Sequence, residues 1–183
     1  MKPFDSMWMQ GVSIADIGML DPTPEPMFDR TTDGISIGFE VPVALVSVID
    51  PDSDRQFFKS HVGLVSPWRE RQETPLSHSF CQYVVATHSP LVVPDAREHE
   101  LVQCNLAIRD LGVIAYLGVP IEGPDGKCVA ALCAISGEPR EWLPREVELM
   151  NRLADGVSAH IRTLAASLAG EQLLQHPSRC FGT

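Results

Sequence analysis

The cysteines carry the most reactive side chains of this 183-residue sequence. There are five of them, and no two are spaced as a Cys-x-x-Cys pair. A thiol in an apolar segment behaves as a small hydrophobic group, and its pKa rises. Four of the cysteines lie in such segments: Cys81, Cys104, Cys128 and Cys133. A redox catalyst would use Cys81 or Cys133 and would need a lowered thiol pKa with a second cysteine nearby. We expect structural free thiols in a reducing cytoplasm, not a disulfide scaffold or a zinc site.

The histidine, serine and aspartate residues form no recognisable catalytic or metal-binding motif. No serine occupies a nucleophile elbow. No group of histidine, cysteine and carboxylate residues has the spacing of metal ligands, so we expect no metal. We therefore assign no catalytic residue and expect no enzyme activity. A thiol-based redox enzyme remains the alternative.

The stretch from Ser77 to Asp95 has the composition of a pocket wall. Apolar residues recur at helical spacing over residues 80–85, and Ser77 can cap the first free N–H groups of that helix. Pro90 ends the helix, because proline cannot continue it. Residues 91–93 then predict a short buried strand, and Asp95 places a carboxylate at its end.

The candidate ligand-binding residues combine apolar walls with a few polar groups, as pockets usually do. They are Ser79, Phe80, Cys81, Asp95, Leu106 and Tyr116. The N-terminus of the 77–88 helix, with Ser79, would donate to an anionic or polar oxygen ligand. The loop 96–113 would be a lid over the pocket. The alternative is that Phe80 and Tyr116 fill the space themselves, as in a close-packed interior. The sequence does not identify the ligand, and it does not indicate whether a cofactor is bound.

Composition limits the partners of the chain. Its hydrophobic content of 44% and its length suit one domain with additional helices. Its net charge of −10 argues against nucleic acid or an anionic membrane surface, because phosphates need a basic partner. No apolar run is long enough to span a membrane, and the N-terminus has no signal-peptide core. We expect a cytoplasmic protein.

The β-branched and apolar run at residues 43–50 predicts a central strand that is covered on both faces. Residues 55–62 predict its hairpin partner. Two further apolar runs, 114–122 and 128–135, flank a Gly-Pro-Asp-Gly turn and predict a second hairpin. We expect this second pair and the 43–50 strand to form the middle of one sheet, and residues 63–76 to be a charged surface loop.

Helices are predicted near both ends of the chain. Residues 27–39 predict a helix, and another begins at Pro144, where acidic residues follow the proline. The second helix carries an apolar stripe with alternating spacings of three and four residues. The stripe consists of Val147, Met150, Ala154, Val157, Ile161, Leu164 and Leu168. A helix of this length overhangs a small sheet, so we expect part of the stripe to pack on a helix of a second subunit. The alternative is that the stripe covers only its own sheet.

Six short strings in this order resemble the GAF domain family, in particular bacterial sensory GAF domains that precede diguanylate cyclases and histidine kinases. They are VALVSVID, FFKSHVGL, ETPLSHSFC, PLVVPDAR, YLGVPI and DGKCVAALCAI, within residues 27–169. The resemblance implies an α+β, PAS-related fold with a central antiparallel sheet of about five or six strands. Helices from the two chain ends would pack on one face, with a ligand pocket on the other. We expect a linker or short helix over residues 1–26, the GAF domain over 27–169 and a tail over 170–183.

The chain departs from several subgroups of that family. Ala130 replaces a glycine of the last strand, and the signature linked to cyclic-nucleotide binding is not recognisable. Gln82, not histidine, follows Cys81, unlike the pattern of bilin-binding relatives. His78 and His88 are haem-ligand candidates by location only. The cysteines could converge as in relatives that reduce methionine sulfoxide, although the surrounding strings differ.

The resemblance thus implies a non-catalytic sensory or regulatory domain that binds a small molecule and signals through a dimeric C-terminal helix. The output domain would be fused or separate. Two alternatives remain: the thiol-based redox enzyme, and a pure dimerisation module whose pocket is filled.

Overall fold

A single six-stranded sheet forms the centre of the molecule. The structure is a computed structural model that describes residues 12–175. The sheet order is β3-β2-β1-β6-β5-β4, and all neighbouring strands are antiparallel. The strands are β1 (Val43–Asp50), β2 (Arg55–Val62), β3 (Glu73–Pro75), β4 (Leu91–Val93), β5 (Ala115–Glu122) and β6 (Cys128–Ser136). The predicted α+β fold and the central position of β1, β6 and β5 are confirmed.

The alternation of β5 gives the sheet two different apolar faces. Ala115, Leu117 and Val119 are buried on the face that carries the terminal helices, whereas Tyr116 is buried on the opposite face. β1 is buried over six consecutive residues, because both of its faces are covered. The strand pattern in the sequence therefore predicted correctly that both faces of the sheet are packed.

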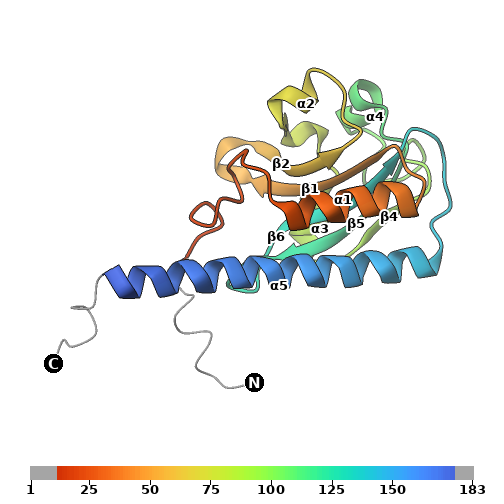
Figure 1. Cartoon of the computed structure of the whole chain (residues 1–183). Coiled ribbons are helices and arrows are strands. Elements are labelled where there is room, and N and C mark those ends of the chain that lie inside the picture. The colour runs from red at the N-terminus through yellow and green to blue at the C-terminus, as the bar shows by residue number, and fades with distance from the viewer. Residues whose placement is uncertain (1–11, 176–183) are drawn as a thin grey trace.

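The two terminal helices, α1 (Pro26–Gly38) and α5 (Pro144–Gln175), lie on one face of the sheet (Figure 1). α1 packs on β1 and β2, and α5 packs mainly on β5. α5 begins after Leu143. The Leu143 N–H donates to a Glu146 carboxylate oxygen at 2.8 Å, so this N–H at the start of the helix has a hydrogen-bond partner. This arrangement confirms the expectation that the helices from the two ends share one face.

The apolar stripe of α5 packs largely within its own subunit. Met150, Ala154, Val157 and Ile161 are buried in the core between α5 and the sheet. α5 also continues past Gly170, where a tail was expected, to Gln175. A single glycine lowers helix stability by only about 1 kcal/mol, so it does not end a helix that is already long. Beyond the sheet the helix projects outward (Figure 1).

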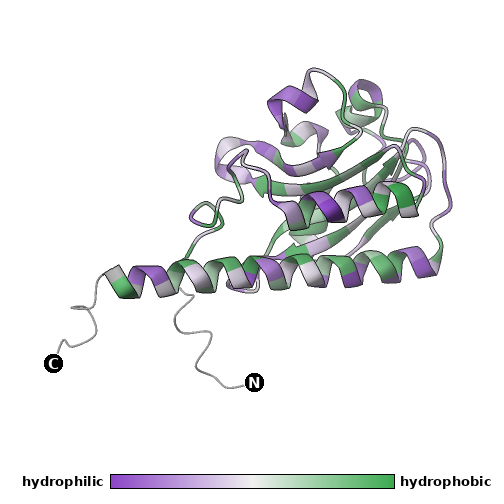
Figure 2. Ribbon diagram, viewed as in Figure 1, coloured by the Kyte–Doolittle hydropathy of each residue, from purple (hydrophilic) through white to green (hydrophobic). Residues whose placement is uncertain are grey.

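Three short helices cover the other face: α2 (Trp68–Arg71), α3 (Cys81–Thr87) and α4 (Leu106–Leu111). The segment 63–76, expected to be a loop, therefore contains α2 and β3. The segment 96–113, also expected to be a loop, contains α4. Figure 2 shows that α2 is largely polar, whereas β1 in the middle of the sheet is largely apolar. The second core, which includes Leu45, Phe58, Val84 and Tyr116, lies between these helices and the sheet.

Two expectations concern the chain ends. Residues 14–20 form turns and not the short helix that was one option for this region. The expected tail from residue 176 onward, with Cys180, lies outside the described residues, as do residues 1–11. Among the helices of residues 12–175, none is long and apolar enough to cross a membrane.

Candidate functional site

A cavity of about 200 Å³ lies between the sheet and the three short helices. Its inner wall is formed by residues of β1, β2, β5 and β6, and its outer wall by residues of α2, α3 and α4. The apolar lining includes Leu45, Phe58, Phe80, Tyr116, Ile135, Ala107, Leu111 and Val113. The structure therefore has open space on the face where the sequence predicted a pocket.

Tyr116 and the first residues of α3 form one side of this cavity. The rings of Phe80 and Tyr116 meet edge to face, with centroids 5.4 Å apart. The Tyr116 hydroxyl donates to Cys81 Sγ at 3.3 Å, and this buried hydroxyl thereby has the partner that burial requires. Gly118 makes the ring position possible, because a Cβ at Gly118 would lie 2.5 Å from Tyr116 Cζ. Phe80, Cys81 and Tyr116, all predicted site residues, are thus brought together.

Two thiols meet behind the Tyr116 ring. Cys81 Sγ and Cys133 Sγ are 3.9 Å apart, and both residues are buried. Hydrogen bonding with Cys133, and then with Tyr116 and Ser47, lowers the pKa of the Cys81 thiol, although burial opposes this effect. Burial raises the pKa of Cys133, and it also raises the pKa of the Tyr116 hydroxyl. The expected rise in thiol pKa therefore applies to Cys133 and, again through burial, to Cys128, but not to Cys81.

Ser79 lies next to the cavity but does not line it. Its hydroxyl donates to Gln56 Oε1 at 2.8 Å and accepts from the Gln82 N–H at 3.0 Å. Gln56 in turn donates to Thr74 Oγ1 at 2.6 Å. Ser79 therefore caps the start of α3, which begins at Cys81 and not at Ser77, and its hydrogen bonds are made within the protein.

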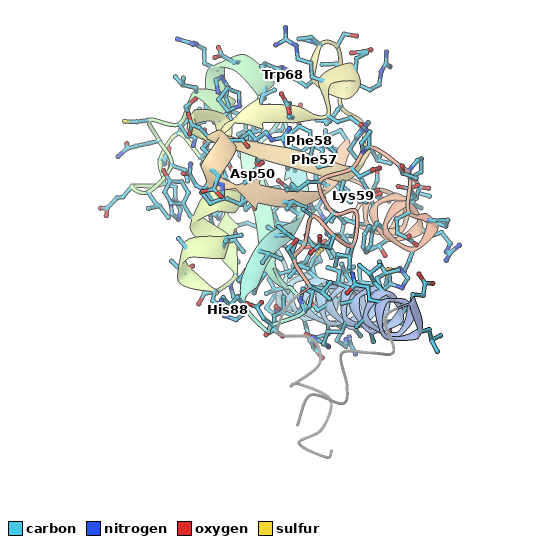
Figure 3. All side chains as sticks on the ribbon, turned by 90° about the vertical axis from the view of Figure 1, so that its left-hand side faces the viewer. Asp50, Phe57, Phe58, Lys59, Trp68 and His88 are labelled. Atoms are coloured by element: carbon cyan, nitrogen blue, oxygen red, sulfur yellow. The ribbon has the colours of Figure 1, made fainter. Side chains whose placement is uncertain are left out.

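His78 and Asp110 form a polar pair at the mouth of the cavity, and the sequence did not predict this pairing. His78 Nε2 lies 3.0 Å from Asp110 Oδ2, and His78 Nδ1 lies 3.0 Å from Ser77 Oγ. Hydrogen bonds from Arg109, followed by that from His78, lower the pKa of Asp110 to about 2. The Trp68 ring of α2 lies 5.9 Å from the His78 ring, and Trp68 stands on the outer side of Phe58 (Figure 3). His78, Asp110 and Trp68 all line the cavity.

The remaining predicted residues do not line the cavity. Asp95 lies in a separate surface groove beside His99 and Arg140, where Arg97 Nε donates to its Oδ1 at 2.9 Å. Leu106 is 37% exposed, and the next residue, Ala107, lines the cavity in its place. Successive residues of a helix point in different directions, so the register of α4 decides which one faces inward.

The structure also bears on the haem and metal options. His88 does not line the cavity: it lies 3.4 Å from Glu122 and far from Trp68 and Phe58 in the view of Figure 3. His78 reaches the mouth of the cavity, but its ring nitrogens already contact Ser77 and Asp110. In residues 12–175, no three His, Cys, Asp or Glu side chains are grouped as metal ligands.

Comparison with known proteins identifies relatives of the whole domain. The family model described as GAF domain matches residues 23–161. A cyclic di-GMP phosphodiesterase of Pseudomonas aeruginosa is 29% identical over 161 residues, which are 84% of this chain and 25% of that protein. The chain therefore spans about a quarter of the length of this curated relative.

Solved structures show the same fold at low sequence identity. A domain of a two-component sensor histidine kinase from Sinorhizobium meliloti is 16% identical, with a TM-score of 0.63 and coverage of 80% of this chain and 97% of that one. A free methionine-R-sulfoxide reductase from Neisseria meningitidis is 15% identical, with a TM-score of 0.62 and coverage of 91% and 95%. At these identities the likeness concerns the fold alone.

Proposed function

This chain belongs to the GAF domain family, and we propose that it is a non-catalytic sensory domain that binds a small molecule in the cavity beside α3. The observation that carries the proposal is the cavity of about 200 Å³ with Phe80, Cys81 and Tyr116 in its wall. Protein interiors are normally close-packed, so open space of this size argues for an occupant. It also argues against the pure dimerisation module, which required side chains to fill the space.

The strand β5 would carry the effect of binding to α5. Tyr116 faces the cavity, whereas Leu117, the next residue, is buried against the terminal helices. The end of β5 is also tied to α5, because the Glu122 N–H donates to Ser158 Oγ at 3.0 Å. A ligand that displaces the Tyr116 ring would therefore shift the strand on which α5 rests, and would favour one packing of α5 over another.

We place the proposed output and partner at the end of α5. GAF domains often stand beside output domains, and the Pseudomonas relative is much longer than this chain. The proposed homodimer would use α5 beyond Ile161, because the stripe residues from Met150 to Ile161 are buried in the same subunit. Leu168 is the outermost stripe residue and is half-buried. The four described cysteines are free thiols, which suits the cytoplasmic location that we propose.

The binding proposal is tested by native mass spectrometry of the protein purified from its own host. We expect a retained small molecule, which the cavity-filling variant Ala107→Leu should lose. Ala159→Leu is the matched control, because Ala159 is an exposed alanine of α5 far from the cavity lining. If the wild-type protein purified from its host carries no small molecule, that result would count against binding.

The same spectra test the dimer. Leu168→Glu should shift the population to monomers, whereas Ser167→Glu, an equal charge at an exposed neighbouring position, should not. A wild-type protein that is monomeric at high micromolar concentration would remove the dimer from the proposal.

One observation supports a second candidate function, a thiol-based reductase. Cys81 lines the cavity, and Cys133 lies 3.9 Å behind it. In such a reaction the two thiols would form a disulfide, and a bound sulfoxide would become a sulfide with loss of its oxygen as water. Turnover of methionine sulfoxide with dithiothreitol as the reductant, abolished by Cys81→Ser, would support this enzyme. Equal rates for the wild type and Cys81→Ser would exclude it.

A further inference from the structure

We infer that the cavity selects an uncharged aromatic molecule of one or two rings and excludes phosphate-bearing and other anionic ligands. This inference rests on the proposed function, because it names the class of molecule that the same cavity would bind. It differs from the expectation of an anionic or polar oxygen ligand that the predicted helix N-terminus suggested. Size, wall chemistry and charge each support it.

The size of the cavity limits the occupant. Drug-sized ligands usually occupy pockets of about 300–1,000 Å³, whereas an apolar cavity of about 150 Å³ already binds benzene. A cavity of about 200 Å³ therefore suits a molecule of one or two fused rings. A dinucleotide such as cyclic di-GMP is far larger than this space.

The walls favour an aromatic ligand. Phe58, Phe80 and Tyr116 line the interior, and Trp68 and His78 line the mouth. Aromatic rings attract one another in edge-to-face and offset arrangements, in addition to the apolar area that they bury. The Phe80–Tyr116 pair already shows an edge-to-face arrangement, with an interplanar angle of 62°. A flat ring can enter between these side chains with little loss of packing.

The charge of the lining disfavours anions. None of the described residues that line the cavity is lysine or arginine, and the one charged side chain among them is Asp110. The low pKa of Asp110, about 2, keeps this carboxylate ionised at neutral pH. Arg109 binds both oxygens of Asp110, so the Arg109–Asp110 pair gives the mouth no net positive charge that would attract an anion. An anion would lose its hydration on entry and meet no lysine or arginine among the lining residues.

The polar groups around the cavity are already paired within the protein. Gln56 binds Ser47, Ser79 and Thr74, and the Tyr116 hydroxyl donates to Cys81. In the first turn of α3, the Gln82 N–H donates to Ser79 Oγ. A ligand with several polar groups would therefore find few free partners, so the binding free energy must come mainly from apolar contact.

The test uses probes that share one ring system and differ in charge. Indole is neutral, indole-3-acetate is anionic and tryptamine is cationic, and cyclic di-GMP serves as the phosphate probe. Binding is measured by calorimetry and by ligand-observed NMR on the wild type, Ala107→Leu and the control Ala159→Leu. We expect indole, a probe that binds more weakly than a ligand retained through purification, to bind with a Kd on the order of 100 µM. Indole-3-acetate should bind at least about tenfold more weakly, and cyclic di-GMP should not bind.

A variant at the mouth tests the charge argument without disturbing the core. Val65 lines the mouth and is 69% exposed, so Val65→Lys should fold normally. We expect this variant to reduce the ratio of the indole-3-acetate Kd to the indole Kd several-fold, because the added cation attracts the carboxylate. Ala107→Leu should abolish indole binding while Ala159→Leu retains it, provided that thermal melting shows both to be folded.

The outcomes separate the inference from the proposed function. If an anionic probe binds more tightly than indole and Ala107→Leu abolishes that binding, the inference fails and the sensory proposal stands. Indole binding that is equal in the wild type and Ala107→Leu would place the site elsewhere and overturn the inference. If no probe binds, the inference also fails, and native mass spectrometry of the host-purified protein then decides the proposed function separately.

Discussion

Gly118 is the position where a single added methyl group should reveal how the Tyr116 ring shapes the cavity. In Gly118→Ala, the new Cβ would lie 2.5 Å from Tyr116 Cζ and 2.6 Å from Cε1. Tyr116 is only 1% exposed, so its ring can move only into the cavity or against its neighbours. The backbone at Gly118 needs no positive φ, because it lies within β5. The effect should therefore come from the ring alone.

The magnitude follows from three contributions. Overpacking in a well-packed interior costs about 1–3 kcal/mol. Loss of the Tyr116–Cys81 hydrogen bond costs about 0.5–1.5 kcal/mol more. Replacing glycine by alanine within a strand offsets about 0.5–1 kcal/mol. We expect Gly118→Ala to lower the free energy of unfolding by about 2 kcal/mol.

A double-mutant cycle isolates the contact between the two residues. Urea unfolding would be measured for the wild type, Gly118→Ala, Tyr116→Val and the double variant, with equal m-values as the condition for comparison. In the Tyr116→Val background, Gly118→Ala should be neutral or slightly stabilising. Gly34→Ala in α1 is the matched control, because no heavy atom lies within 4 Å of an added Cβ there, and it should stabilise by up to about 1 kcal/mol. An equal cost of Gly118→Ala in both backgrounds would refute the reasoning.

Three further predictions follow from burial and charge. The double variant Val157→Glu, Ile161→Glu should unfold, since both wild-type side chains are fully buried. If circular dichroism shows that this variant is folded and sedimentation shows that it is monomeric, the two residues lie at an interface between subunits instead. The folded pKa of Asp110, about 2, is below its ordinary value of 3.8, so its charge stabilises the fold above pH 3.8 and loses this effect as the pH falls through 2. The stability difference between the wild type and Asp110→Asn in urea titrations should therefore shrink over that interval, and a constant difference would contradict the charge effect. Cys104 should react rapidly with a maleimide at neutral pH because it is exposed, whereas the buried Cys81 should react only slowly. Peptide mapping identifies the labelled cysteines, and rapid labelling of Cys81 would favour the redox enzyme.

The sheet could be predicted from the sequence because its signals are local. The run at residues 43–50 is apolar without alternation, which indicates a strand covered on both faces, and β1 is buried on both faces. The period of two of a strand places Tyr116 and Leu117 on opposite faces of β5, as the structure shows. A buried tyrosine hydroxyl needs a hydrogen-bond partner, and that of Tyr116 donates to Cys81. Each of these inferences needed only the residues of one strand.

The stripe of α5 shows where a local pattern becomes ambiguous. Spacings of three and four residues place side chains on one face of a helix, whether that face meets a second helix or a sheet. The structure assigns Met150, Val157 and Ile161 to the sheet of the same subunit. After Leu168, the next positions with this spacing are Glu171 and Gln172, which are polar and exposed. A short sheet thus uses most of the stripe, and only the end of α5 is left for a partner.

The polar mouth of the cavity depends on contacts between segments that are distant in the sequence. Asp95 follows a predicted strand and Asp110 lies in the expected loop 96–113, and neither local sequence shows which carboxylate reaches the cavity. The Asn105 side chain caps α4 through the Ala107 N–H and also donates to the Ser79 carbonyl at 3.1 Å, across 26 residues. This double contact fixes α4 beside residues 76–79, so that Asp110 meets His78 across 32 residues. Because the Asn105 bonds set the position of α4, Asn105→Ala should loosen the mouth and weaken ligand discrimination without changing the apolar walls.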